Sequence, residues 1–163
     1  MKVLIADKFP DLYVKKLQEL GLDVVYSPKM GEEDIANNSK DFNIIIVRST
    51  KVNAKAIENS TNLNLIIRAG AGVDNIDIQA ANKRGVYVAN CPGKNSIAVA
   101  ELTIGLMLSL DRRIPDNVAD FHKGIWNKEE YSKANGLFGR NLALIGVGNI
   151  GKEVAKRALA LGM

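Results

Sequence analysis

Short apolar runs alternate with helix-like segments through residues 3–89, and this alternation limits the possible folds more than any other feature of the chain. The runs have the length of strands and are rich in Val, Ile and Leu, whereas the segments between them are polar with spaced apolar residues. The run 44–47 is apolar throughout, as in a parallel strand that is covered on both faces. The sequence therefore predicts an α/β fold with a doubly wound parallel sheet. The expected strands are 3–6, 24–26, 44–47, 63–67 and 86–89, and the expected helices between them are 11–20, 31–40, 53–60 and 77–84.

Residues 91–94, with the sequence Cys-Pro-Gly-Lys, interrupt this alternation and mark a candidate domain boundary. The segment 96–110 that follows is apolar on almost every side, and its only charged residue is Glu101. It is too short and too polar to cross a bilayer. We therefore expect a buried helix that joins two domains or lines a dimer contact. Residues 116–126 are predicted to continue as an amphipathic helix.

Composition and charge exclude several classes of protein. The chain is 47% hydrophobic and 25% charged, which is ordinary for a globular protein and excludes a disordered one. The single cysteine, Cys91, excludes an intramolecular disulfide. With only one histidine and one cysteine in the chain, the sequence shows no cluster of metal ligands. The net charge of +4 is mixed in sign along the chain and does not indicate a nucleic-acid partner. The N-terminus lacks the long uncharged core of an export signal, so we expect a cytoplasmic protein with no membrane partner.

The most specific motif is a glycine fingerprint formed by Gly146, Gly148 and Gly151. It directly follows the run 141–145, which is predicted to be a sixth strand, and it opens an amphipathic helix. In this context the first glycine makes the turn, the second lets the backbone approach a pyrophosphate, and the third lets the helix pack on the strand. The motif therefore predicts dinucleotide binding. The acidic residue that would hold the ribose is expected about 20 residues further on, past Met163, which leaves NAD and NADP as alternatives.

A second glycine loop runs from Gly70 to Asn75 and also follows an expected strand. It has Asn75 where the third glycine of the fingerprint would be, which makes it a poorer pyrophosphate site. Its backbone N–H groups could form a small anion-binding nest. The alternative is a tight strand-to-helix turn with Asp74 as the N-cap of the next helix. Composition alone leaves both interpretations open.

Two arginines, Arg48 and Arg68, close expected strands. Ligands of open α/β sheets bind outside the carboxyl ends of the strands. Since an arginine can grip a carboxylate or a phosphate with two parallel hydrogen bonds, both residues are candidate ligand-binding groups, with a solvated loop arginine as the alternative. The only histidine, His122, lies on the predicted amphipathic helix and is expected to be a surface or interface residue rather than a catalytic one.

Long stretches of the chain resemble the D-2-hydroxyacid dehydrogenases. The similarity is carried by residues 65–115, by Gly124 and Trp126 in a Gly-x-Trp motif, and by residues 137–163, with the sequence LFGRNLALIGVGNIGKEVAKRALALGM. The stretch from Arg68 to Asn75, together with Val47, Arg48 and Ser49, looks most like the members of the family that oxidise 3-phosphoglycerate. The resemblance extends along essentially the whole chain.

The resemblance implies two domains. Residues 1–94 would form a flavodoxin-like substrate-binding domain with a doubly wound parallel sheet. Residues 95–163 would contribute the first strand, loop and helix of a Rossmann dinucleotide-binding domain, with the helix 96–110 at the hinge and at a dimer interface. The cofactor would be NAD, the substrate a small anionic 2-hydroxy acid that is phosphorylated, and the assembly a homo-oligomer formed through residues 95–126.

The resemblance also implies roles for individual residues. Arg48 and Ser49 would approach the substrate, the backbone of Gly70, Ala71 and Gly72 would hold its carboxylate, and Asn95 would help to orient it. Ala71 would also lie near the cofactor, whose pyrophosphate would contact Gly146, Gly148, Asn149, Ile150 and Gly151. Many family members have arginine where Asn149 stands, so this chain lacks one phosphate charge there.

The catalytic Arg, Glu and His of the family follow the glycine fingerprint and match no residue of the chain, which is therefore predicted to be inactive by itself. One alternative is a glyoxylate or hydroxypyruvate reductase of the same family. Another is a non-catalytic ligand-binding or dimerising fragment. A signalling receiver domain is disfavoured, since it needs an acceptor Asp where the chain has Arg48, Ser49 and Thr50.

Overall fold

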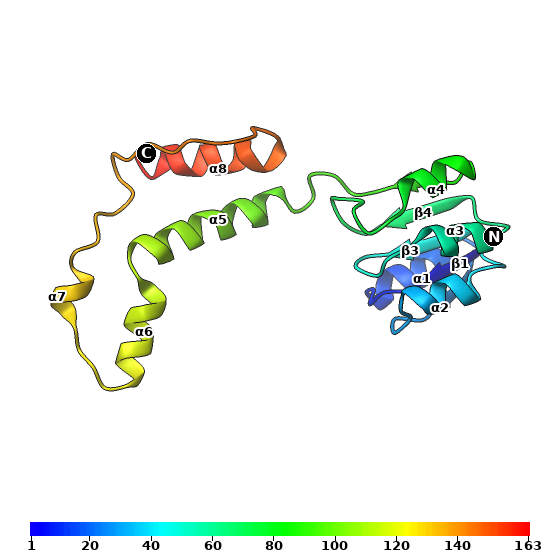
Figure 1. Ribbon diagram of the computed structural model, residues 1–163, viewed down its shortest axis with the longest axis horizontal. Helices are drawn as coiled ribbons and strands as arrows, with labels where there is room; N and C mark the ends of the chain where they lie inside the picture. The colour runs from blue at the N-terminus through cyan, green and yellow to red at the C-terminus, as the bar shows by residue number, and fades with distance from the viewer. The chain divides into compact units, whose positions relative to one another are not determined.

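The computed structural model describes residues 1–163, which divide into two compact units, Met1–Pro92 and Gly93–Met163. We call them the N-terminal unit and the C-terminal unit and describe each by itself (Figure 1).

The N-terminal unit is built on a parallel sheet of five strands in the order β2-β1-β3-β4-β5. This order is that of flavodoxin-like doubly wound sheets. The predicted fold class is confirmed, and each predicted strand lies within two residues of an observed one. The strands are β1 (Lys2–Ile5), β2 (Asp23–Tyr26), β3 (Ile44–Val47), β4 (Leu65–Arg68) and β5 (Tyr87–Ala89), and the helices are α1 (Asp11–Glu19), α2 (Glu32–Asn38), α3 (Ala54–Asn59) and α4 (Ile78–Lys83).

The strands are apolar on both faces because helices cover both faces. Side chains alternate along a strand, so neighbouring residues of β3 point to opposite sides of the sheet. One side packs against α2, α3 and α4 through buried residues that include Leu4, Ile35, Ile45, Ile57 and Ile66. The other side packs against α1 through Val3, Ile5, Val14 and Ile46. The sheet is therefore the centre of a three-layered core in which β1 and β3 are the most deeply buried strands.

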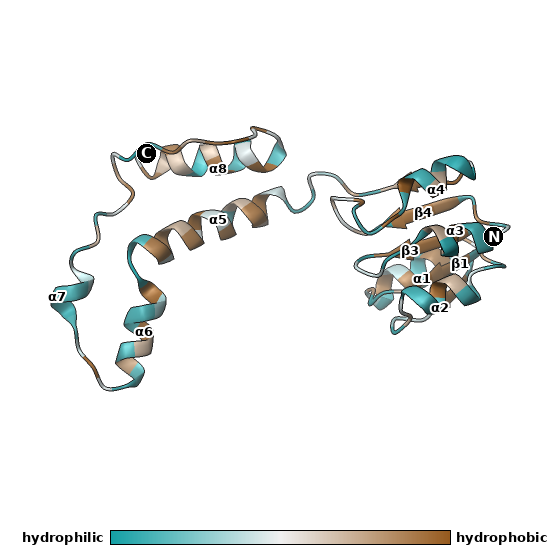
Figure 2. Ribbon diagram, in the orientation of Figure 1, coloured by the Kyte–Doolittle hydropathy of each residue, from teal (hydrophilic) through white to brown (hydrophobic).

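The C-terminal unit contains helices only: α5 (Ser96–Asp111), α6 (Ile114–His122), α7 (Lys128–Tyr131) and α8 (Asn149–Ala160). Helices α5 and α8 pack together through Ala100, Ile104, Val154 and Ala158. Glu101 lies outside this contact and forms an ion pair with Arg157 of α8 at 3.3 Å. Figure 2 shows that α5 is hydrophobic along most of its length, and its leucines away from α8, such as Leu102 and Leu106, are exposed.

The predicted strand 141–145 is wrong for this structure, because the segment belongs to no sheet. A strand needs a hydrogen-bonded neighbour, and the C-terminal unit offers none. Leu142 and Leu144 instead pack against the α5–α8 contact, while Ile145 is fully exposed.

The predicted helix 116–126 is displaced, since α6 begins at Ile114 and ends at His122. Gly124 adopts a left-handed backbone (φ +74°), and the N–H of Ile125 returns to the carbonyl of Asp120. This turn closes the helix before Trp126.

None of the helices combines the length and the apolar character needed to cross a membrane.

Candidate functional site

Three loops of the N-terminal unit leave the sheet at the carboxyl ends of adjacent strands. Asp7 follows β1, residues 48–50 follow β3, and the glycine loop 70–75 follows β4. Because β1, β3 and β4 are parallel neighbours, these loops share one edge of the sheet. The predicted position of Arg48, Arg68 and Gly70–Gly72 at strand ends is confirmed, and it brings them to the edge where α/β proteins bind ligands.

The Asp7 carboxylate holds the loop after β3. Its Oδ2 accepts hydrogen bonds from the backbone N–H groups of Arg48 at 2.6 Å, Ser49 at 3.0 Å and Thr50 at 3.0 Å. Its Oδ1 accepts a further bond from the Thr50 hydroxyl at 3.0 Å. Successive N–H groups that converge in this way form an anion nest, and here a carboxylate of the chain itself occupies it.

The pKa of Asp7 reflects this arrangement. Partial burial raises the pKa, but the hydrogen bonds from the backbone of Arg48, Thr50 and Ser49 and from the Thr50 side chain together outweigh it. The pKa therefore lies below the ordinary value of 3.8, and Asp7 is a carboxylate at neutral pH.

Arg68 links the loop after β3 to the glycine loop. Its Nε donates to the carbonyl of Arg48 at 3.0 Å, and its Nη1 donates to the carbonyl of Gly72 at 3.4 Å. A β-carbon on Gly70 would lie 2.5 Å from Arg68 Nη1, so the loop lies against the guanidinium because Gly70 has no side chain. Arg68 is thus committed in large part to contacts within the protein.

Asn75 and Asn90 hold the glycine loop from its two sides. Asn75 Nδ2 donates to the Thr50 carbonyl at 2.7 Å, and the Val52 N–H donates to the Asn75 carbonyl at 2.8 Å. Asn90 Nδ2, after β5, donates to the Ala71 carbonyl at 2.7 Å. The asparagine that replaces the third glycine of the fingerprint is therefore a structural residue that joins two loops.

The glycine loop does not end in a helix cap at Asp74, and that alternative is wrong. The N-cap of α4 is Asp77, whose Oδ1 accepts from the Ala80 N–H at 2.9 Å. The N–H groups of Ala71 and Gly72 donate to no group of the protein. They are free to donate to an anion, and the anion-nest interpretation stays a prediction.

The groups left free at this edge are donors. Arg48 and Ser49 are exposed, and their side chains have no hydrogen-bond partner within the N-terminal unit. Together with the free N–H groups of Ala71 and Gly72, they can receive a small anionic molecule with a carboxylate or a phosphate.

The glycine fingerprint of the C-terminal unit forms the turn and the helix start that its motif predicts, although no strand precedes it. Gly146 adopts φ +94°, and Gly148 is the N-cap of α8. A β-carbon on Gly151 would overlap the carbonyl oxygen of Gly146, whereas one on Gly148 would meet nothing within 4 Å. The first helical hydrogen bond runs from the Lys152 N–H to the Gly148 carbonyl at 3.0 Å, and the N–H groups ahead of it in α8 donate to no group of the protein. This helix start fits a pyrophosphate.

Two other predicted residues belong to the C-terminal unit. Asn149 is exposed in the first turn of α8, and its Nδ2 would lie 3.3 Å from a β-carbon on Gly93. Asn95 is the exposed N-cap residue of α5, and its side chain makes no capping hydrogen bond. Arg48, Ser49 and Gly70–Gly72 thus belong to the N-terminal unit, whereas Asn95 and the glycine fingerprint belong to the C-terminal unit.

Comparison with known proteins identifies the family. The sequence profile described as "D-isomer specific 2-hydroxyacid dehydrogenase, catalytic domain" matches residues 3–160. The chain belongs to this family. The D-3-phosphoglycerate dehydrogenase of Methanocaldococcus jannaschii is 42% identical over 164 residues, which cover 100% of the chain and 31% of that protein. The hydroxypyruvate reductase of Thermotoga maritima is 45% identical over 140 residues, which cover 85% of the chain and 45% of the relative.

Solved structures of the D-2-hydroxyacid dehydrogenase family share the fold. The NAD+-bound 3-phosphoglycerate dehydrogenase of Entamoeba histolytica is 34% identical, with a TM-score of 0.77 over 100% of the chain and 52% of that structure. The chain spans about a third of the length of its phosphoglycerate dehydrogenase relative and about half of this solved structure.

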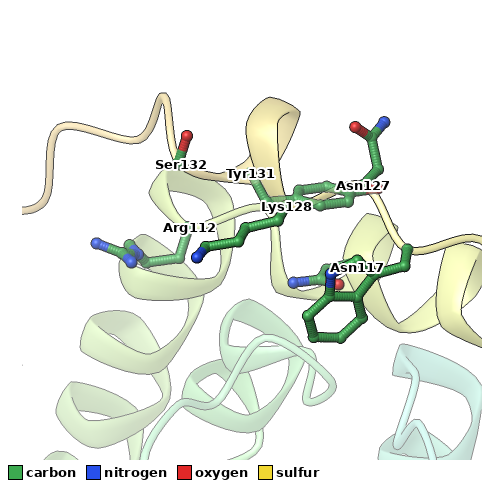
Figure 3. A pocket seen from close by; sticks show the side chains of 7 residues that line it. Arg112, Asn117, Asn127, Lys128, Tyr131 and Ser132 are labelled. Atoms are coloured by element: carbon green, nitrogen blue, oxygen red, sulfur yellow. The ribbon is translucent and has the colours of Figure 1, made fainter.

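The chain also carries a pocket of about 270 Å³ that the sequence did not predict (Figure 3). It lies between the end of α5, α6 and α7, and its lining includes the cations Arg112 and Lys128. Tyr131 at its wall donates to Asp120 at 2.6 Å, and this hydrogen bond raises the pKa of Tyr131 to about 12. His122 is exposed at the last position of α6.

Asp7 is a site residue that the sequence analysis missed. It follows an apolar run directly, as Arg48 does, so the rule that ligand-site residues follow strands would have found it.

Proposed function

We propose that the chain is the substrate-binding unit, residues 1–94, and the beginning of the NAD-binding unit, residues 95–163, of an oxidoreductase that acts on the CH–OH group of a 2-hydroxy acid. The preferred substrate is 3-phosphoglycerate. The observation that carries this proposal is the pair of free donor groups at one rigid sheet edge: the Arg48 guanidinium and the unpaired N–H groups of Ala71 and Gly72.

The two donor groups suit the two anionic ends of this substrate. The guanidinium of Arg48 would grip the phosphate with parallel hydrogen bonds, and Ser49 would add a hydroxyl donor. The backbone of Gly70, Ala71 and Gly72 would hold the carboxylate. Asn95 would orient the substrate from the C-terminal unit. The name of the M. jannaschii relative supports a phosphorylated substrate.

The helix start at Gly148 would hold the pyrophosphate of NAD. Its support is the clearance around Gly148, the close packing of Gly151 on Gly146, and the NAD+ named in the E. histolytica structure. Asn149 and Ile150 would contact the phosphates, and Ala71 would lie near the cofactor. When bound, NAD supplies the acceptor for the hydride that leaves C2 of the substrate. The residues of this chain would bind and orient both molecules.

The resemblance to the family implies that its catalytic Arg, Glu and His match no residue among 1–163. We propose that the 163-residue chain binds its ligands and turns over none of them, and that it assembles into a homo-oligomer through residues 95–126. NADH production from 3-phosphoglycerate by the purified chain would contradict the first part.

A hydroxypyruvate or glyoxylate reductase is the second candidate function. It is favoured by the T. maritima relative, whose identity over its shorter alignment is 45%. Such a substrate has a carboxylate but no phosphate, so it would use the glycine loop and leave Arg48 without a phosphate partner.

The experiment that separates the two is a titration of the isotope-labelled chain with 3-phosphoglycerate and with D-glycerate, followed by NMR. We expect shifts at the side-chain resonances of Arg48 and Ser49 and at the backbone amides of Gly70–Gly72, and a preference for 3-phosphoglycerate. Arg48→Gln should weaken binding of 3-phosphoglycerate about tenfold or more, because a hydrogen bond to a charged group is lost, and should change D-glycerate binding little. Lys83→Gln, in the last turn of α4, is the control. Equal affinity for both acids, unchanged by Arg48→Gln, would favour the reductase.

A further inference from the structure

Asp7 has no role in the proposed binding of substrate or cofactor, yet it makes four hydrogen bonds to one loop. Its partners lie 41 to 43 residues away in the sequence, so the contact joins the end of β1 to the end of β3. Asp7 is in no ion pair, and all its partners are donors of the loop 48–50. The Asp7 carboxylate therefore stabilises one conformation of the loop 48–50.

The bonds from Arg48, Ser49 and Thr50 go through the backbone, which leaves the side chains of Arg48 and Ser49 free. The neighbouring glycine loop differs, because its Ala71 and Gly72 N–H groups have no acceptor. The edge thus contains two sets of backbone donors, and a carboxylate of the chain occupies one of them.

We propose that Asp7 is a positioning residue for the anion site. It fills the nest after β3, holds the loop so that Arg48 and Ser49 face an incoming ligand, and directs that ligand's anionic groups to the Arg48 guanidinium and to Ala71 and Gly72. This proposal rests on the proposed function, because it concerns the same site. The role of Asp7 and the identity of the substrate can nevertheless fail separately, since binding of any small anion to Arg48 would depend on Asp7.

The test uses inorganic phosphate and 3-phosphoglycerate as probes on the isotope-labelled chain. In the unaltered chain phosphate should shift the Arg48 Nε–H and the amides of Ala71 and Gly72, and leave the backbone amides of residues 48–50 unmoved. In Asp7→Ala phosphate should instead shift those three backbone amides, since their nest is empty. The affinity for 3-phosphoglycerate should fall about tenfold or more, because the charge-assisted bonds that hold the loop are gone.

Asp7→Asn keeps the size of the side chain and tests the positioning role of Asp7 if Asp7→Ala does not fold. It should move the amide resonances of residues 48–50 upfield, because a neutral oxygen is a weaker acceptor, and should bind 3-phosphoglycerate less tightly than the unaltered chain. Asp23→Asn, at the exposed start of β2, is the control and should change neither property.

Three outcomes are decisive. Unaltered anion affinity and unaltered loop amides in both Asp7 variants would overturn the positioning role. Absence of any anion effect at Arg48 in the unaltered chain would overturn it as well. Phosphate binding that depends on Asp7, without binding of 3-phosphoglycerate, would uphold the role of Asp7 and refute the proposed substrate.

Discussion

Gly151 packs against the carbonyl oxygen of Gly146 so closely that no side chain fits between them. At Gly148 of the same motif, by contrast, an added β-carbon would contact no atom of the protein. The two glycines therefore serve different purposes. Gly151 allows α8 to start against the turn, and Gly148 keeps the approach to the helix start clear.

Alanine substitutions separate these purposes. Gly151→Ala should destabilise the C-terminal unit by about 1–3 kcal/mol, because the new methyl group overpacks against the backbone. Hydrogen exchange of the α8 amides would then be faster. Gly148→Ala should leave exchange unchanged but weaken NAD binding, measured by calorimetry. The prediction fails if Gly148→Ala speeds exchange as much as Gly151→Ala does.

At the residue scale, the sequence indicated where charged groups gather but not which of them are free. Arg48 and Arg68 both lie at the carboxyl ends of strands, and the sequence alone does not distinguish them. In the structure Arg68 donates to the carbonyls of Arg48 and Gly72, whereas the Arg48 side chain has no partner in its unit. This difference depends on the path of two loops that meet only in the folded chain, and no local pattern contains that information.

At the element scale, the cap of α4 tests how the glycine loop is connected to the helix. Asp77→Ala should cost about 1 kcal/mol, because the Ala80 N–H loses its acceptor. Asp74→Ala is the matched control. Asp74 was the cap in one of the two interpretations that the sequence left open, but it is exposed and caps nothing, so its loss should change stability by less than about 0.5 kcal/mol. Urea unfolding of the N-terminal unit would measure both values. A larger effect at Asp74 than at Asp77 would contradict this assignment.

Elements were predictable where local pattern and burial agree. The strands β1 and β3 are continuous apolar runs, and the structure buries them in the centre of the sheet. The run 141–145 is also apolar but forms no strand. A strand needs a second strand to which its backbone can hydrogen-bond, and apolar side chains alone do not supply one. The helix 116–126 was misplaced because Gly124 permits a left-handed turn that ends α6 early.

At the scale of the whole molecule, α5 has an exposed apolar surface that no other element covers. Leu102 is 62% exposed and Leu106 is 55% exposed, and both lie on the side of the helix away from Ala100 and Ile104, which pack against α8. Such a surface is typical of a protein interface. It agrees with the proposed homo-oligomer through residues 95–126.

Replacing both leucines tests this surface. Leu102→Gln with Leu106→Gln should weaken self-association at least tenfold, because each buried leucine contributes about 1.5–3 kcal/mol. Sedimentation velocity over a range of concentrations would measure the change. Leu12→Gln with Leu20→Gln alters two similarly exposed leucines of the N-terminal unit and should leave association unaltered. Equal loss in both double variants would exclude α5 as the specific interface.

Hydrogen bonds that involve Asp7, Arg68 and Asn75 hold the loops 48–50 and 70–75 in place, which has a thermodynamic consequence for ligand binding. The backbone freedom of the segments after β3 and β4 is lost when the sheet forms, before any ligand arrives. An anion that binds there has few protein torsions left to order. If the proposed site binds small acids, the edge of the sheet would then act as a preorganised receptor and discriminate among them by the spacing of their charges.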